Sequence, residues 1–295
     1  MPLLPRDALG KLGESMREYG LRETVERSSL WVAERLLGGT IRRHRRAPLS
    51  AFAQAASSMH FSAQDLLESY VVFRNGKASL SQLHSEYETL CGQIEERYRT
   101  QTLFYPQYYA VEQSSSFLLY ALVRSLRPSV VLETGVANGH SSFFLLNAMR
   151  ANDHGTLHSI DRSPEVGSLL ASEERERWSL HVLQAKSLKR SFLQILNELP
   201  PIDLFLHDSD HTYPWQSFEL RVALKKLAPG GILASDDCDG CNAFLDFCQG
   251  VGLRPVILVE TRKVFGLVFT WPMDHYTTGV RDEAEAAQQP RLARA

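Results

Sequence analysis

The chain of 295 residues is long enough for one full α/β core and an additional segment, because single domains usually contain on the order of 100 to 200 residues. Hydrophobic residues make up 44% of the chain and charged residues 22%, which excludes a disordered or fibrous protein. The formal net charge of -2 provides no strong field for nucleic acid or an anionic membrane, so we expect neither as a partner.

Other global features predict a cytoplasmic protein with reduced thiols. The N-terminus lacks the apolar core of a signal peptide, and no stretch approaches the roughly 18 apolar residues of a membrane span. The basic run at residues 42–46 is short and interrupted, which favours a solvated helix end or loop. Cys238 and Cys241 form a C-x-x-C, but no second pair follows, so we interpret them as packing residues rather than zinc ligands.

The first 100 residues predict helices. Apolar residues recur at helical spacing from about Leu12 to Leu37, before Gly38-Gly39, and again over residues 62–72 and 80–98. The last of these helices places four apolar residues on one face: Leu83, Tyr87, Leu90 and Ile94. We therefore predict a helical N-terminal region over residues 1–100, compatible with a homo-oligomer interface and equally with a cap on the sheet.

After residue 100, short apolar strands alternate with helical segments, which is typical of a parallel sheet with crossover helices. The predicted strands are residues 130–133, 156–161, 180–184, 203–207, 231–235, 255–260 and 264–270. Only Thr261-Arg262-Lys263 joins the last two, so they form an antiparallel hairpin. We predict a Rossmann-like α/β domain over residues 101–275 and a mobile tail over residues 276–295.

A glycine turn follows the first predicted strand, in the sequence Glu133-Thr134-Gly135-Val136-Ala137-Asn138-Gly139-His140-Ser141-Ser142. Ligands of open α/β sheets bind at this place, outside the carboxyl ends of the strands. Gly135 permits a sharp turn, and Gly139 permits a ligand to approach the backbone near a helix start. The middle glycine of the dinucleotide fingerprint is absent, which disfavours a nicotinamide cofactor.

Two acidic residues flank this turn. Glu133 ends the first predicted strand and Asp161 ends the second, where a carboxylate can accept hydrogen bonds from ribose hydroxyls. A helix cap or a solvated loop charge explains either acid alone. The order of acid, glycine loop and acid is more specific, and it predicts a nucleoside cofactor.

The segment from Glu133 to Ser142 resembles motif I of class I S-adenosylmethionine (SAM) dependent methyltransferases, and Asp161 matches the family's ribose-binding acid. Residues 227–231 match the turn before the fifth strand, and the last strand of that fold is also antiparallel. The resemblance implies SAM as cofactor and a site that contains Glu133, Gly135, Asn138, Gly139, Ser141 and Asp161. Many relatives have Gly-Asp-Ser after strand three, where this chain has Ala185-Lys186-Ser187, so the adenine contacts of that loop differ.

Three carboxylates follow two further strands. Asp208 follows the fourth predicted strand and Asp236-Asp237 the fifth, so they face one crevice. Clustered like charges are costly unless a cation neutralises them, and oxygen ligands suit Mg²⁺ or Ca²⁺ best. The pattern predicts a metal site of Asp208, Asp236 and Asp237, with helix caps as the alternative.

The arrangement resembles magnesium-dependent O-methyltransferases of the macrocin and aminocoumarin type and the cephalosporin hydroxylase-like proteins. In these relatives an Asp after strand four and an acidic pair after strand five hold the ion. Their Asp-x-Asp-His motif falls on Asp208 to His211. The resemblance implies catalytic roles for Asp208 and His211, with His211 as general base, although a structural hydrogen bond explains His211 about as well.

We therefore expect a SAM-dependent, Mg²⁺-assisted O-methyltransferase that acts on a hydroxyl of a small molecule, such as a sugar or phenolic natural product. One alternative is a non-catalytic SAM-binding partner of another enzyme. Another is metal-independent transfer to nitrogen or carbon, with Asp236 and Asp237 as caps. The aromatic segment at residues 103–109 is either a lid over the crevice or part of the core.

Overall fold

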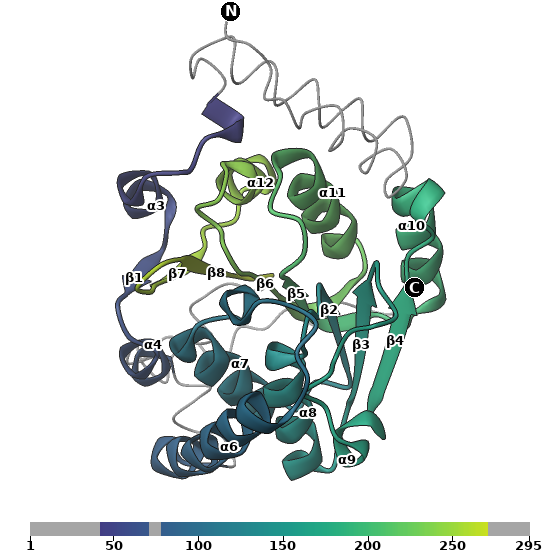
Figure 1. The fold of residues 1–295 in the computed structure, drawn as a ribbon. Helices are drawn as coiled ribbons and strands as arrows, with labels where there is room; N and C mark the ends of the chain where they lie inside the picture. The colour runs from purple at the N-terminus through teal and green to yellow at the C-terminus, as the bar shows by residue number, and fades with distance from the viewer. Residues whose placement is uncertain (1–41, 71–77, 271–295) are drawn as a thin grey trace, which may run out of the picture.

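An eight-stranded sheet organises residues 42–70 and 78–270, the parts of the chain that the computed structural model describes (Figure 1). The strands are β1 Ser58–His60, β2 Val130–Thr134, β3 Thr156–Asp161, β4 Trp178–Val182, β5 Ile202–His207, β6 Leu227–Ser235, β7 Val256–Val259 and β8 Val264–Phe269. The α-helices are α3 Leu49–Ala55, α4 Ala63–Ser69, α6 Leu80–Thr100, α7 Gln113–Leu126, α8 His140–Asn152, α9 Ser172–Arg175, α10 Leu188–Glu198, α11 Tyr213–Leu224 and α12 Ala243–Val251. None of these helices is long and apolar enough to cross a bilayer.

The sheet order is β1-β7-β8-β6-β5-β2-β3-β4. Strand β8 is antiparallel to both β6 and β7, and the remaining strand pairs are parallel. The predicted Rossmann-like fold and its antiparallel last strand are confirmed. From β2 the chain runs outward to β4 and then returns to β5 beside β2, so a crevice opens between the carboxyl ends of β2 and β5.

Seven strands were predicted, and strand β1 was not among them. The expectation that residues 1–100 contain only helices was wrong at Ser58–His60. This strand pairs with the edge strand β7 over Ser58 to His60 and Val256 to Leu258. The three residues have no apolar alternation of their own, and the strand forms because the edge of β7 offers backbone partners. Such long-range pairing leaves no local signal in the sequence.

Helices cover both faces of the sheet, and each face has its own apolar core (Figure 1). One core lies under α4, α6, α7 and α8, and the other under α3, α10, α11 and α12. Side chains of β2 alternate between them, with Val131 in the first core and Val130 and Leu132 in the second. This is the period-two pattern of a strand that is buried on both faces.

The N-terminal region shares the first core. Ser79 caps α6 by accepting a hydrogen bond from the Gln82 N–H at 3.2 Å, and the predicted apolar face of this helix is buried. Those side chains join the cluster that contains the α7 and α8 residues. Residues 80–100 therefore pack against the α/β domain directly. The helices predicted before residue 41 and the tail predicted after residue 275 lie outside the described residues.

A buried ion pair fastens α6 to this domain. Arg97 Nη1 and Nη2 donate to the two carboxylate oxygens of Glu174 at 2.9 and 3.0 Å, and Nη1 also donates to the Leu169 carbonyl at 2.7 Å. The Glu174 side chain is 2% exposed. Two residues further along the helix, Arg99 pairs with Glu96 on the exposed face, with exposed fractions of 72% and 56%.

We expect Arg97→Ala to lower the free energy of unfolding by about 3 kcal/mol, because it removes the two-pronged partner of buried Glu174 and leaves only the Arg150 guanidinium, 3.8 Å away. Arg99→Ala removes an exposed pair from the same helix and is expected to cost less than about 0.5 kcal/mol. Urea unfolding of both variants measures the two values. Equal, small losses would show that the Arg97 pair does not fasten α6.

Candidate active site

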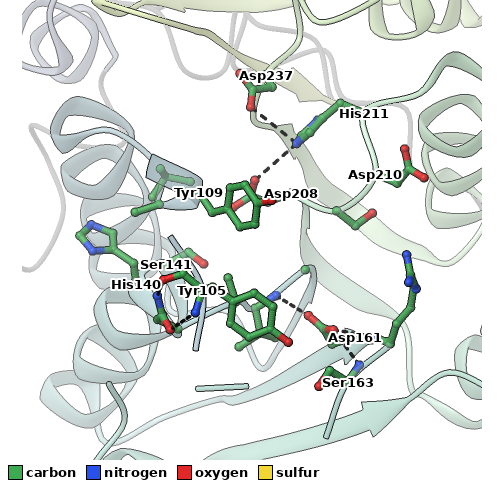
Figure 2. A pocket seen from close by; sticks show the side chains of 18 of the residues that line it. Tyr105, Tyr109, His140, Ser141, Asp161, Ser163, Asp208, Asp210, His211 and Asp237 are labelled. Atoms are coloured by element: carbon green, nitrogen blue, oxygen red, sulfur yellow. Dashed lines mark hydrogen bonds and ion pairs between the residues drawn. The ribbon is translucent and has the colours of Figure 1, made fainter. Parts of the chain in front are cut away.

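A cavity of about 850 Å³ opens at the carboxyl ends of β2, β3 and β5 (Figure 2). Residues of the glycine turn, the end of β3, the segment after β5 and the aromatic segment before α7 line it. Asp237 and Lys263 also line it. The cavity therefore contacts both of the places where the sequence predicted chemistry.

Gly135 lies where the cofactor loop meets the end of β5. Its φ is +80°, and a Cβ atom at this position would lie 2.0 Å from the carbonyl oxygen of Asp208. No side chain fits there, so glycine is required by close approach as well as by backbone conformation. Gly139, at φ +91°, is outside the lining, and its Cβ would meet Gly167 at 3.0 Å. It packs against the loop after β3, which is not the ligand approach that the sequence predicted.

Glu133 was predicted to contact the cofactor, but the structure buries it completely beneath the loop and outside the cavity lining. It accepts hydrogen bonds from Ser141 Oγ at 3.0 Å, Ser159 Oγ at 2.6 Å and the Ser142 hydroxyl. Burial raises the pKa of Glu133 to about 7, and the serine hydroxyls oppose that rise. Glu133 thus fixes the start of α8, including Ser141, which does line the cavity.

Asn138 joins the cofactor loop to the aromatic segment. Its Oδ1 accepts from the backbone N–H groups of Phe104 and Tyr105, both at 3.1 Å, and its Nδ2 donates to the Tyr105 carbonyl at 2.7 Å. Tyr105, Tyr108 and Tyr109 line the cavity, and Tyr108 and Tyr109 are 62% and 50% exposed. The aromatic segment therefore forms a wall at the cavity mouth and is not part of the core.

Asp161 lines the cavity at the end of β3 and anchors two loops (Figure 2). Its Oδ2 accepts from the Val136 N–H at 2.8 Å, and its Oδ1 accepts from the N–H groups of Arg162 and Ser163 at 2.6 and 3.0 Å. A carboxylate offers about four lone-pair sites, so three backbone bonds leave capacity for a ligand hydroxyl. Ala185 also lines the cavity, whereas Lys186 is exposed and outside the lining.

The predicted acidic cluster does converge, around two basic side chains. His211 Nε2 lies 3.7 Å from Asp208 Oδ1 and 3.7 Å from Asp237 Oδ2 (Figure 2). Lys263 Nζ lies 2.6 Å from Asp236 Oδ2 and 3.3 Å from Asp237 Oδ2. Asp236 is fully buried and outside the cavity lining, whereas the other four residues line it.

Burial and the cluster's charges displace the pKa values of these groups. Burial and the neighbouring Asp236 raise the pKa of Asp208 to about 8, against the opposing effect of His211 and Lys263. Burial disfavours the charged form of His211, but Asp208, Asp237 and Asp236 outweigh it and raise its pKa. The same carboxylates outweigh the burial of Lys263 and raise its pKa above the ordinary value. Lys263 is therefore a cation at every physiological pH.

The predicted divalent ion does not fit these residues. The Lys263 ammonium already contacts Asp236 and Asp237, two of the three predicted ligands. An Mg²⁺ ion there would be held beside a buried positive charge, which Coulomb repulsion opposes. Within residues 42–70 and 78–270, no group of three His, Cys, Asp or Glu side chains is arranged to hold a metal. The sequence prediction did not consider Lys263.

Glu219 is a second residue that sequence reasoning missed. This buried acid of α11 accepts from Thr134 Oγ1 at 2.6 Å, Ser209 Oγ at 2.9 Å and Trp215 Nε1 at 2.5 Å, and it pairs with His207 Nδ1 at 2.7 Å. It therefore connects the end of β2 to the segment that carries Asp208. The one sequence signal that could have identified Glu219 is its position as a lone glutamate on the apolar side of a helix.

Residues 132–238 match the model of a family described as a methyltransferase domain. No curated protein sequence matches the chain. The match includes the glycine turn, Asp161, Asp208 and both acids after β6. The predicted resemblance to methyltransferases is confirmed.

Solved structures to which this chain is similar include O-methyltransferases. One from Streptomyces achromogenes, involved in tomaymycin synthesis and in complex with SAM, is 21% identical with a TM-score of 0.47, over 62% of this chain and 89% of that one. One from Bacillus cereus in complex with SAH, the demethylated cofactor, is 17% identical with a TM-score of 0.46, over 63% and 89% of the two chains. A SAH-bound Podospora anserina methyltransferase is 15% identical with a TM-score of 0.47, over 62% and 88%.

We expect Asp161→Asn to weaken SAM binding by at least about tenfold, because a charged acceptor for the ribose hydroxyls is lost. Asp203→Asn is a matched control at the opposite end of the sheet, where Asp203 Oδ2 accepts from the N–H groups of Ser129 and Val130 at 2.8 and 2.9 Å. Calorimetric titration gives both affinities, and thermal unfolding without SAM compares stabilities. Equal affinities in the two variants would contradict a cofactor role for Asp161.

Glu133 provides a pH test of the loop. Its folded pKa of about 7 lies above the value of about 4.3 in an unfolded chain, so the folded state binds the proton more tightly. The contribution of Glu133 to stability is therefore complete below about pH 4 and is lost as the pH rises through about 7.

Between about pH 5 and pH 8, wild type should lose about 2 kcal/mol of unfolding free energy relative to Glu133→Gln, which has no charge to bury. Urea unfolding across this range measures the difference. Glu88→Gln, at a side chain that is 68% exposed, should run parallel to wild type. If Glu133→Gln also runs parallel to wild type, the buried carboxyl does not titrate in this window.

Proposed function

We propose that this chain, whose methyltransferase domain is of the SAM-dependent class I type, methylates a hydroxyl oxygen of a small molecule. The observation that carries the proposal is the set of residues that line one cavity. Asp161 and the glycine turn line one part of it, and His211 lies between Asp208 and Asp237 in another (Figure 2). A cofactor site and a base thus share one space.

In this proposal the cofactor lies along the carboxyl ends of β2 and β3. Asp161 accepts from the ribose hydroxyls, and the turn from Gly135 to Asn138 lies against the rest of SAM. Ser141 and the backbone at the start of α8 face the carboxylate of the cofactor, where a helix N-terminus favours negative charge. Tyr105 covers this part of the cavity, since Asn138 holds its backbone on both sides.

The acceptor then lies beside His211. His211 Nε2 removes the hydroxyl proton as the oxygen attacks the methyl carbon of SAM. A carbon–oxygen bond forms, the carbon–sulfur bond breaks, and its electron pair returns to sulfur, giving a neutral thioether. Asp237, 3.7 Å from Nε2, stabilises the imidazolium that results, and Asp208, whose raised pKa favours the neutral carboxyl, lies at the same distance from Nε2.

An oxygen acceptor is favoured over nitrogen or carbon by the need for this base. An alcohol or phenol attacks a sulfonium methyl well only when it loses its proton, whereas a neutral amine already has a free lone pair. A half-buried histidine beside Asp208 and Asp237 supplies what a hydroxyl requires. The predicted metal assistance has no place in this mechanism, because the residues at the site do not fit the ion.

The cavity wall indicates the acceptor class. Three tyrosines line the mouth, and aromatic side chains bind the faces of sugar and phenol rings. A volume of about 850 Å³ falls in the range of small-molecule sites. We therefore propose a sugar or phenolic hydroxyl as acceptor.

The test is turnover of SAM with a panel of phenols, catechols and sugars, followed by NMR of the methyl group transferred from isotope-labelled SAM. We expect an O-methyl product. His211→Gln should reduce turnover by about 10² to 10⁴ with little change in SAM affinity, because only the base is lost.

His154→Gln is the matched control. His154 lies at the other end of the sheet, where its Nε2 contacts Ser129 Oγ at 3.1 Å, and its replacement should leave turnover unchanged. A methyl group found on nitrogen or carbon would refute the oxygen acceptor. SAM binding without turnover on any acceptor would favour a non-catalytic SAM-binding protein.

A further inference from the structure

Lys263 occupies the centre of the acidic cluster. Its ammonium lies 2.6 Å from Asp236 Oδ2 and 3.3 Å from Asp237 Oδ2, and its side chain is 8% exposed. Asp236 is completely buried, and its Oδ1 has no hydrogen-bond partner among the described residues. Lys263 is therefore the cation that allows this carboxylate to be buried.

The backbone fixes Lys263 on both sides. The Cys238 N–H donates to the Val264 carbonyl at 2.8 Å, and the Val264 N–H donates to Asp239 Oδ1 at 3.0 Å. Before it, the N–H groups of Thr261 and Arg262 donate to Glu112 at 3.1 and 2.9 Å. The hairpin turn is thus clamped to the loop after β6 and to the start of α7, and the side chain of Lys263 is directed by these contacts.

Lys263 also faces the cavity, which a purely structural ion pair would not. It lines the same space as Asp208, His211 and Asp237, whereas its partner Asp236 lies behind it. An ammonium has three N–H donors, and two of them are accounted for by Asp236 and Asp237. Within residues 42–70 and 78–270 no other side chain pairs with this ammonium, so its third donor is available to an oxygen in the cavity.

We propose that Lys263 is the resident cation of the acceptor site and takes the place that a divalent ion has in metal-dependent O-methyltransferases. The inference rests on the proposed function and deepens it. The ammonium neutralises Asp236 and Asp237, holds the acceptor oxygen and stabilises the negative charge that develops as His211 takes the proton. Methyl transfer by this chain then needs no metal, and Lys263 keeps its proton throughout.

The first experiment titrates Mg²⁺ into the wild-type protein by calorimetry and measures its thermal unfolding with Mg²⁺ and with EDTA. We expect no binding heat and the same unfolding midpoint in both. Binding of Mg²⁺ that disappears in Asp237→Asn would overturn the proposal.

The second experiment uses Lys263→Ala, which leaves Asp236 and Asp237 without their ammonium partner. We expect the unfolding midpoint to fall by about 10 °C. Mg²⁺ at about ten times its dissociation constant should then restore about 4 °C, because an ion now binds where the ammonium was. A midpoint that does not fall, or that Mg²⁺ does not raise, would overturn the proposal.

Two further variants control this experiment. Lys226→Ala removes a lysine whose Nζ donates to the Asn197 carbonyl at 3.4 Å, and its midpoint should respond neither to the substitution nor to Mg²⁺. If Lys263→Ala alone does not fold, the double variant Lys263→Ala/Asp236→Asn removes the unpaired charge as well and should fold. A double variant that also fails to fold would show that Lys263 does not act by charge compensation.

None of these readouts requires SAM or an acceptor, so they separate the two proposals. If the protein methylates oxygen but binds Mg²⁺ at Asp237, only the proposed role of Lys263 is refuted. If the protein binds no Mg²⁺ but methylates nitrogen, only the proposed oxygen acceptor is refuted. Where an acceptor is found, turnover should be unchanged by EDTA.

Discussion

The close approach of Gly135 to the Asp208 carbonyl is the constraint on which the rest of the site depends. The Asp208 N–H donates to the Thr134 carbonyl at 3.0 Å, and the Gly135 N–H donates to the Ile160 carbonyl at 2.9 Å. The ends of β2, β3 and β5 are thereby held in one bonded row. Because no Cβ intervenes at Gly135, the cofactor loop and the segment carrying Asp208 and His211 meet at backbone distance. In the proposed function, this close approach brings the cofactor and the acceptor side by side for direct transfer.

Three buried acids, Glu133, Glu174 and Asp236, are each satisfied in a different way. Glu133 lies among serine hydroxyls, and its pKa is correspondingly raised. Glu174 has a two-pronged arginine, which together with its other hydrogen bonds outweighs burial and lowers its pKa. Asp236 has an ammonium from a distant hairpin, but its complete burial, together with the neighbouring Asp237, outweighs that cation and raises its pKa. The contrast between Glu133 and Glu174 follows from the partner, since a neutral donor does not compensate a buried charge as a full positive charge does.

The sequence predicted the fold well because its signals are local. Apolar runs and glycine turns mark each strand of the α/β domain, and the short link between the last two strands fixed their antiparallel pairing. The position of Asp161 at a strand end was also readable. The burial of Glu133 could not be predicted from the sequence, because a strand-end acid looks the same in sequence whether it faces a ligand or the serines beneath a loop. Strand β1 and Lys263 were missed for a related reason: each acquires its role from a partner far along the chain, and no periodicity records such contacts.

The placement of Lys263 has a consequence for biosynthesis. Translation from the N-terminus completes the cofactor loop, Asp208, and then Asp236 and Asp237 before it reaches the hairpin that carries Lys263. A nascent chain that ends at β6 contains all three carboxylates without the ammonium that compensates them. Burial of Asp236 at that stage would leave a charge unpaired, so the loop after β6 stays open to water until β7 and β8 join the sheet. The carboxylates after β6 are therefore fixed by strands that are synthesised after them, and a chain that ends before residue 263 lacks the ammonium that pairs with Asp236 and Asp237.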